Sequence, residues 1–277
     1  MSDTLRTEIP PAFTFSQSSL QDYADCPRRF QLRYLEQLAW PAVESEPILD
    51  NERRQREGQL FHRLVQQHRL GLPVDKLSRL AGSPDLERWW RNYLRQDFAI
   101  DGYTQFSELS LAAPIEQFRL LAKYDLVAVQ PGEKALIFDW KTYHKKPKDE
   151  WMAARMQTRV YRALLARAGT HLNGGTPIPP EKIEMVYWFA DFPSEPLRLP
   201  YSAGQFKRDW DALSGMVREL SHHRLFPKTD DEKKCAFCPY RSYCNRGEKA
   251  GNLDNQEVES ELAGIEINFE QIGEIEF

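Results

Sequence analysis

The period of the hydrophobic pattern changes near residue 106, and no other feature of this 277-residue sequence restricts the fold as strongly. Upstream of that point, apolar residues recur at helical spacing. This pattern predicts helices over residues 16–38, 50–70 and 84–98. Downstream, three apolar runs rich in β-forming residues are separated by short turns, one of them marked by Pro131-Gly132. These runs predict strands over residues 106–115, 118–129 and 134–142.

The rest of the chain continues this mixed pattern. It predicts a helix that ends at Gly169, then a strand and a further helix, over residues 151–168, 182–190 and 202–222. This order of elements indicates an α/β fold with a central mixed β-sheet flanked by helices. We expect an extended leader, one domain and an acidic tail, over residues 1–15, 16–250 and 251–277.

The residues with the most informative chemistry lie between Lys123 and Lys141. The segment LLAKYDLVAV places Asp125 inside one apolar strand, and ALIFDWKTY places Asp139 and Lys141 at the end of the next. Residues two apart on a strand share a face, and adjacent strands of a hairpin can bring the two carboxylates together. Such a pair suits Mg²⁺ or Mn²⁺, and a nearby ammonium can stabilise a phosphorane or orient the attacking water. Taken alone, a D-x-K pattern more often describes surface charges at strand ends.

Polar residues on two predicted helices favour a site over surface charges. His62 lies in EGQLFHRLV, and Gln157 and Tyr161 lie four residues apart, on one face of the helix after the D-x-K strand. Each feature has a structural reading of its own: a half-buried histidine, and a polar rim beside a core tyrosine. Their combination with Asp125 and the D-x-K strand indicates a metal-dependent site.

The cysteine pattern indicates a second metal site. Cys26 precedes Cys235 by 209 positions, and Cys235, Cys238 and Cys244 form C-x2-C-x5-C. The sequence shows neither a secretory signal nor an apolar run of roughly 20 residues, so we expect a cytosolic protein with no membrane partner. Disulfides are rare in that compartment, which makes clustered thiols candidates for metal binding. From the residues alone, a 4Fe–4S cluster, tetrahedral Zn²⁺ and free thiols all stay open.

The net charge of −4 is unevenly distributed along the chain. Residues 252–277 hold eight acidic residues and no Lys or Arg, so the remainder carries +4. Candidates for phosphate binding in that remainder are Arg28, Arg29, Lys145, Lys146 and Lys148. Trp89 and Trp90 either stack on unpaired bases or belong to the core. The tail is interpreted as a solubilising segment, a strand that docks on a protein partner, or a DNA mimic.

Together these segments resemble the RecB-like branch of the PD-(D/E)XK nucleases, which includes CRISPR-associated RecB-like exonucleases and the AddB nuclease domain. The resemblance extends from about residue 14 to residue 246 and rests on SQSSLQDYADCPRRF, GQLFHRLV, AKYDLV, FDWKTY, QTRVY and CAFCPYRSYC. One departure is Ala122 with Lys123, where the family often has a glycine before the Asp strand. The resemblance implies a restriction-endonuclease-like core whose N- and C-terminal parts are joined by a four-cysteine cluster.

The resemblance also implies a role for each matching residue. The metal ligands would be His62, Asp125, Asp139 and the backbone carbonyl of Trp140. Lys141 would assist catalysis, while Gln157 and Tyr161 would organise the site and the DNA. A 4Fe–4S cluster, with zinc as the alternative, would be held by Cys26, Cys235, Cys238 and Cys244.

The expected activity is that of a metal-dependent deoxyribonuclease, with Mg²⁺ or Mn²⁺ as its cofactor. We expect an exonuclease on single-stranded DNA or DNA ends, in DNA repair, recombination or CRISPR adaptation. The alternatives are a non-catalytic or weakly catalytic DNA-binding module of a larger complex, or the same nuclease stabilised by zinc.

Overall fold

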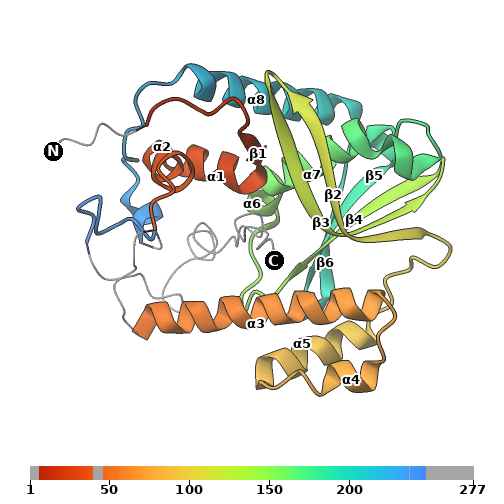
Figure 1. The fold of residues 1–277 in the computed structure, drawn as a ribbon. Helices are drawn as coiled ribbons and strands as arrows, with labels where there is room; N and C mark the ends of the chain where they lie inside the picture. Colours follow the sequence, from red (N-terminus) through yellow and green to blue (C-terminus); the bar gives the residue numbers. More distant parts are fainter. Residues whose placement is uncertain (1–5, 40–45, 237, 248–277) are drawn as a thin grey trace, which may run out of the picture. The chain divides into compact units, whose positions relative to one another are not determined.

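The structure is a computed structural model that describes residues 6–39, 46–236 and 238–247, with the backbone alone for residues 46–52. It divides into two compact units. Unit 1 combines residues 1–8, 18–55 and 224–277, and unit 2 combines residues 9–17 and 56–223. Figure 1 follows the chain through both units. The predicted acidic tail, residues 251–277, lies outside the described residues.

Unit 2 is built on a mixed sheet, which confirms the predicted α/β class. The described strands are β1 (Thr14–Ser16), β2 (Thr104–Ile115), β3 (Phe118–Gln130), β4 (Lys134–Lys141), β5 (Ile183–Phe189) and β6 (Phe192–Pro200). Their order is β1-β3-β4-β5-β6, with β2 paired to β3 as well. The β1–β3 and β4–β5 pairs are parallel, whereas β2–β3, β3–β4 and β5–β6 are antiparallel.

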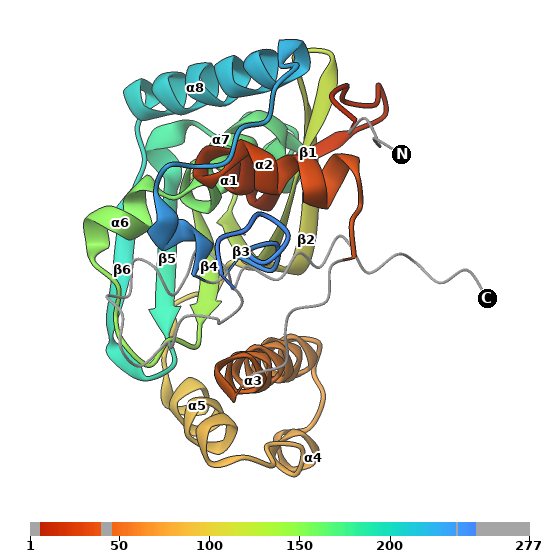
Figure 2. The ribbon, with the colours of Figure 1, turned by 90° about the vertical axis from the view of Figure 1, so that its left-hand side faces the viewer.

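Helices cover both faces of this sheet. The helices of unit 2 are the part of α3 (Glu46–Arg69) after Gln55, α4 (Val74–Ser78), α5 (Pro84–Arg95), α6 (Asp149–Ala154), α7 (Met156–Ala168) and α8 (Ala203–His222). Short 3-10 turns span Gly169–Asn173 and Pro180–Lys182. Helices α3, α4 and α5 gather on one side, while α7 packs on the other and carries α8 (Figure 2). Serine hydroxyls cap two of them, since Ser83 accepts from the amide of Leu86 and Ser202 from that of Gln205.

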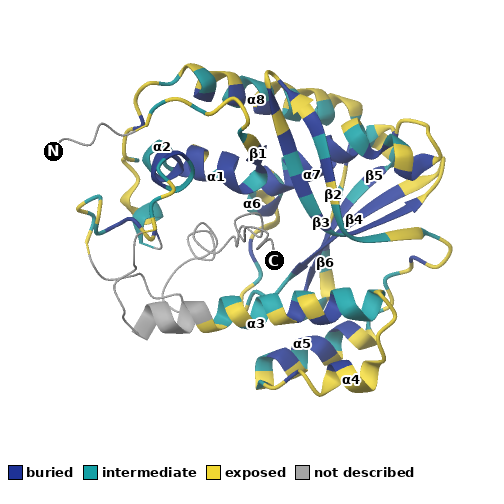
Figure 3. Cartoon of the chain, viewed as in Figure 1, coloured by how far each residue is buried: buried dark blue, intermediate teal, exposed yellow. Residues whose placement is uncertain are grey.

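One hydrophobic core of unit 2 lies between the sheet and α3 to α5. Trp140 and Trp188 project from β4 and β5 into this core, where Phe61 of α3 stacks on Trp188 and packs edge-on against Trp89. These strands are dark blue in Figure 3, as expected for strands covered on both faces. Trp89 and Trp90 are 1% and 3% exposed, so they belong to this core, and the alternative that they stack on bases is wrong.

Two helices predicted as continuous are interrupted. The predicted helix 16–38 consists of α1 (Gln17–Asp25), α2 (Pro27–Phe30) and a π-helix (Gln31–Leu35), because Cys26 is extended at φ −161°, ψ 107°. A proline after it disfavours helical geometry at Cys26. The predicted helix 151–168 breaks at Arg155, which is also extended, at φ −63°, ψ 149°. Beyond this break, the Thr158 hydroxyl donates to the carbonyl of Met152, at 2.6 Å, so a side chain bridges the two helices.

Strands β1 and β6 and helix α4 of unit 2 are absent from the sequence prediction. Strand β6 carries Pro193, Pro196 and Pro200, which argue against a strand by themselves. It lies at the edge of the sheet, the position where a strand tolerates missing amide donors. Helix α4 has five residues, too few to show a helical period.

Among its described residues, unit 1 contains α1, α2, the π-helix, the part of α3 up to Gln55 and a 3-10 turn at Glu232–Cys235. Arg29 is buried there, with its Nε 2.8 Å from Asp22 and its Nη2 2.7 Å from Asp25. Phe30 stacks on Phe226, which joins the N-terminal and C-terminal segments of this unit. Within the described ranges of the whole chain, no helix combines the length and the apolar character needed to cross a membrane.

Candidate active site

The site begins where β4 separates from β3. The two strands pair from Lys134 to Phe138, and beyond Phe138 strand β4 pairs only with β5. The amide of Trp140 therefore lacks a carbonyl partner on β3, and it donates instead to Oδ2 of Asp125, at 2.9 Å. A charged oxygen on a backbone amide is a strong hydrogen bond. Because the strands diverge, the Asp125 carboxylate is held near the C-terminal end of β4.

Asp139 and Lys141 share a face of β4, and Gln157 of α7 joins them. Lys141 Nζ lies 2.7 Å from Asp139 Oδ1 and donates to Gln157 Oε1 at 2.9 Å. Gln157 Nε2 donates to Asp139 Oδ2 at 2.6 Å. Each side chain therefore holds the other two, and their alternation with Phe138 and Trp140, which lie in the aromatic core, explains why they face α7.

His62 reaches the site from α3. Its Nδ1 lies 3.3 Å from Asp125 Oδ1. One turn earlier, Gly58 lies so close to the end of β4 that a β-carbon there would be 3.0 Å from the Thr142 hydroxyl. The lack of a side chain at Gly58 therefore lets α3 approach the strand closely enough for His62 to contact Asp125.

Tyr161 lies one turn after Gln157 and fixes α7 to β3. Its hydroxyl donates to the carbonyl of Lys123 at 2.6 Å, and the Tyr124 hydroxyl donates to the carbonyl of Tyr161 at 2.9 Å. The two rings lie 4.7 Å apart. These reciprocal bonds set the distance from Gln157 to the strand that carries Asp125. The structure thus brings together all six side chains predicted for the site, namely His62, Asp125, Asp139, Lys141, Gln157 and Tyr161.

The two carboxylates differ in their electrostatics. Burial raises the pKa of Asp139 to about 6, against the nearby Lys141 ammonium and with the help of the Asp125 charge. Burial acts in the same direction on Asp125, but His62 and the Trp140 amide outweigh it and lower the pKa of Asp125. For His62, burial disfavours the charged ring, yet the Asp125 carboxylate raises the pKa of His62 overall. Asp125 is therefore the ionised partner, and Asp139 is the carboxyl that retains a proton more readily.

The residue types of the site, two carboxylates and an imidazole, suit a hard divalent cation, although these side chains are not arranged to hold one in the structure. Among the described residues, no three or more His, Cys, Asp or Glu side chains are arranged to hold a metal ion. Asp139 Oδ1 lies beside the Lys141 ammonium, and Asp139 Oδ2 accepts from the Gln157 amide. Two carboxylates and an imidazole remain the chemistry that Mg²⁺ or Mn²⁺ selects. The indole of Trp140 is buried. The role of the Trp140 backbone carbonyl as a metal ligand stays a prediction.

The residues predicted to bind DNA fall into both units. Lys145 and Lys148 are exposed on the segment after β4, and Lys146 lies 3.4 Å from Glu195. In unit 1, Arg28 is half-buried and donates to Gln31 at 2.7 Å. The prediction for Arg29 is corrected, because its guanidinium is 4% exposed and lies in ion pairs within unit 1.

Sequence reasoning missed the residues that anchor the segment after β4. Asp191, in the turn between β5 and β6, accepts from Arg88 at 2.8 Å and from the Trp89 indole at 2.9 Å. His144 Nδ1 lies 2.9 Å from the other Asp191 oxygen. Burial favours the neutral carboxyl, yet His144 and Arg88 lower the pKa of Asp191. Asp191 follows an apolar strand, and nothing in its neighbours reveals a partner about 100 positions upstream.

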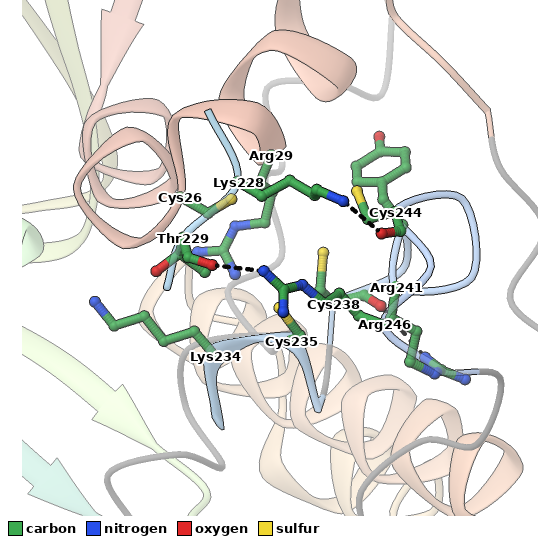
Figure 4. Close-up of a pocket in the computed structure, with 11 residues that line it drawn as sticks. Cys26, Arg29, Lys228, Thr229, Lys234, Cys235, Cys238, Arg241, Cys244 and Arg246 are labelled. Atoms are coloured by element: carbon green, nitrogen blue, oxygen red, sulfur yellow. Dashed lines mark hydrogen bonds between the residues drawn. The ribbon is translucent and has the colours of Figure 1, made fainter. Parts of the chain in front are cut away.

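All four cysteines line one pocket of unit 1, with an empty volume of about 350 Å³ that includes open solvent (Figure 4). Cys26 comes from the break between α1 and α2, and Cys235, Cys238 and Cys244 come from the C-terminal segment. Burial raises the pKa of the Cys238 thiol to about 12, with the Arg29 charge acting in the opposite direction. Five cations also line the pocket: Arg29, Lys228, Lys234, Arg241 and Arg246. The four thiols thus line one pocket that is rimmed by positive charge, although the described side chains are not arranged to hold a metal ion.

Comparison with known protein families identifies the superfamily of the chain. A family model of the PD-(D/E)XK nuclease superfamily matches residues 14–245, and the chain belongs to this superfamily. No curated protein sequence matches the chain. The solved structure of SSO0001 aligns over 83% of this chain and 85% of its own, with 10% identity and a TM-score of 0.39. A protein from Eubacterium rectale described as a candidate exonuclease covers 78% of this chain and 84% of its own, with 10% identity and a TM-score of 0.48.

Proposed function

We propose that this protein is a metal-dependent deoxyribonuclease that acts as an exonuclease on single-stranded DNA or DNA ends. The observation that carries the proposal is the convergence of Asp125, Asp139 and Lys141 where β4 leaves β3, in a chain of the nuclease superfamily. DNA repair, recombination or CRISPR adaptation are the processes in which such an activity would serve.

The metal would be Mg²⁺ or Mn²⁺, held by His62, Asp125, Asp139 and the backbone carbonyl of Trp140. When bound, such an ion polarises a phosphoryl oxygen and makes water a better nucleophile. Asp125 is already fixed by the Trp140 amide, so its oriented carboxylate needs little reorganisation to accept a cation. Asp139 would exchange its contact with Lys141 for the cation.

Lys141 is the group we assign to catalysis. Its ammonium is held 2.9 Å from Gln157, and it lies over the Tyr187 ring at 5.6 Å. These contacts keep the charge in place when Asp139 turns to the metal. Lys141 would then orient the attacking water or stabilise the added negative charge on the phosphate. Gln157 and Tyr161 would hold this arrangement rather than react.

The DNA strand would lie along the exposed cations after β4. We assign phosphate contacts to Lys145, Lys146 and Lys148, together with Arg28 of unit 1. The Asp191 anchor supports this assignment, because it fixes His144, the residue next to Lys145. Contacts of this kind neutralise phosphates without reading bases, so we expect no sequence specificity.

We further propose that the four cysteines bind a 4Fe–4S cluster, with tetrahedral zinc as the alternative. The cluster would tie Cys26 to the C-terminal segment and so stabilise unit 1. Its role would be structural. Because both metals take four thiolates, an absorbance spectrum and elemental analysis are needed to distinguish them.

The second candidate function is a DNA-binding module without catalysis, which would use the same cations. Asp139 favours a catalytic site, since burial of an ionisable carboxyl is costly and gives nothing to DNA binding. A partner protein for the acidic tail also stays a proposal.

Protein purified without oxygen tests the function directly. It should shorten a 5′-labelled single-stranded oligonucleotide with Mg²⁺ or Mn²⁺, and not in EDTA. Lys141→Met should bind the same oligonucleotide with unchanged affinity and fail to cut it. A wild-type protein that binds DNA and never cuts it with either metal would instead establish the module without catalysis.

A further inference from the structure

Lys123 lies on the same face of β3 as the proposed metal ligand Asp125. Buried and more exposed side chains alternate along the first part of this strand. The more exposed set is Arg119, Leu121, Lys123 and Asp125. Residues two apart on a strand are roughly 7 Å apart. Lys123 is therefore a cation one strand repeat from the site, and its side chain is 39% exposed.

A carboxylate from the neighbouring strand holds the Lys123 ammonium. Glu108 Oε2 lies 2.7 Å from Lys123 Nζ, and the Glu108 side chain is 24% exposed. In the β2–β3 register, Ser107 pairs with Leu126 and Leu109 with Tyr124, so Glu108 lies at the strand position facing Asp125, although these two residues do not form a regular pair. Glu108 also has a φ of 53°, which a residue with a side chain rarely adopts within a strand. The sheet thus places a second acid at the strand position facing Asp125, and this acid holds Lys123.

The backbone of Lys123 is fixed to the catalytic helix as well. Its carbonyl accepts the Tyr161 hydroxyl at 2.6 Å, one turn from Gln157. The backbone position of Lys123 is therefore fixed relative to Gln157, which contacts both Asp139 and Lys141. Lys141 is 13% exposed, whereas Lys123 reaches much further into solvent. The two lysines thus differ in what they can bind, since only the more exposed one can meet a second phosphate.

We propose that Lys123 binds the DNA phosphate adjacent to the scissile one, and that Glu108 holds its ammonium until DNA arrives. This inference rests on the proposed nuclease function. A carboxylate and a phosphate oxygen offer the same charge-assisted bond to an ammonium. Glu108 therefore competes with the phosphate for the ammonium, and it keeps Lys123 oriented until the phosphate replaces it. Lys123 would be a substrate-binding residue and Glu108 a positioning residue.

Fluorescence anisotropy with a labelled single-stranded oligonucleotide, without added divalent metal, tests the inference. Lys123→Gln should weaken binding about tenfold, whereas Lys123→Arg should keep the wild-type affinity. The slope of log affinity against log salt should fall by about 0.7 in Lys123→Gln, the value for one phosphate on a single strand. Glu108→Gln should act in the opposite direction and tighten binding a fewfold.

The chain provides a matched control in a second cross-strand ion pair. Lys134 Nζ lies 2.6 Å from Glu184 at the other end of β4, with side-chain exposures of 44% and 14%. Lys134→Gln should leave both affinity and salt slope unchanged. If Lys123→Gln and Glu108→Gln lowered only the melting temperature, the pair would be structural and the inference would be overturned.

Cleavage assays separate this inference from the proposed function. A wild-type protein that cuts DNA together with a Lys123→Gln variant that binds like wild type would overturn the phosphate contact alone. A wild-type protein that never cuts, together with a reduced salt slope in Lys123→Gln, would overturn catalysis and keep the contact.

Discussion

The carboxylate–lysine site of unit 2 and the cysteine pocket of unit 1 show two ways of bringing together the residues of a proposed metal site. The first is held by a sheet: strand divergence presents the Trp140 amide to Asp125, and α7 brings Gln157 to Asp139 and Lys141. The second joins short segments from both ends of the chain, with little regular structure between them. Extended packing fixes the side chains of the first site without a metal.

The cores of the two regions differ in the same sense. A large aromatic core that includes Phe61, Trp140 and Trp188 supports the unit 2 site. The cluster beside the cysteines contains the buried residues Leu32, Cys238 and Tyr240. Unit 1 joins short segments from both ends of the chain, so the proposed metal centre would add more to the stability of unit 1 than to that of unit 2. On the proposed function, a metal in unit 2 would serve catalysis, and a metal in unit 1 would serve stability.

The largest expected effect is that of Asp139→Asn. This change should lower the cleavage rate by at least about 10³-fold, because it removes a metal ligand worth several kcal/mol in the transition state. The absorbance of the cysteine centre should not change. Asp209→Asn is the control, since Asp209 is a mostly buried carboxylate that accepts from Tyr201 outside the site. Cleavage at the wild-type rate by Asp139→Asn would refute the assignment.

Cys26→Ser should act on unit 1 instead. Freshly purified wild-type protein should be brown, with broad absorbance near ~400 nm and stoichiometric iron. The variant should lose both, and residues of unit 1 should become sensitive to limited proteolysis, whereas unit 2 should resist it. Stoichiometric zinc without iron in the wild-type protein would rule out the 4Fe–4S cluster and support the zinc site. Equal proteolysis of both units would contradict the comparison.

The pH dependence of metal binding follows from the pKa of Asp139, which is raised to about 6. A carboxyl that still holds its proton cannot bind the cation, and the raised pKa of His62 acts with the same sign. Mn²⁺ should therefore raise the melting temperature at pH 7.5 and have little effect at pH 5. In Asp139→Asn this difference between the two pH values should shrink. A Mn²⁺ effect of equal size at pH 5 would exclude Asp139 as a ligand.

Two tyrosine hydroxyls give the smallest and most closely matched test. Tyr161→Phe removes a bond to the Lys123 carbonyl in unit 2, and Tyr240→Phe removes a 3.0 Å bond to the Leu38 carbonyl in unit 1. Each should cost about 1–2 kcal/mol of stability, because a carbonyl loses its partner. Tyr161→Phe should slow cleavage a fewfold and keep the cluster. Tyr240→Phe should speed cluster loss in air and keep the cleavage rate, and the reverse pattern would contradict the comparison.

Local patterns predicted most of unit 2. Three strands alternate or run apolar for their full length, so β2, β3 and β4 were predicted to within a few residues. Lys141 and Asp139 share a face because side chains alternate along any strand, so the sequence was sufficient for that pair. Helix breaks at Cys26 and Arg155 were missed, because a helical period continues across a single extended residue.

The sequence by itself determined the α/β class, the strand meander and the residue types available for chemistry, since these depend on neighbours within a few positions. Only the tertiary structure decided that Arg29 is buried in ion pairs rather than exposed for phosphate. Only the structure also decided that Glu108 faces Lys123 and that Asp191 anchors His144. Those contacts depend on strand register and on segments up to about 100 positions apart, for which a single sequence carries no local signal.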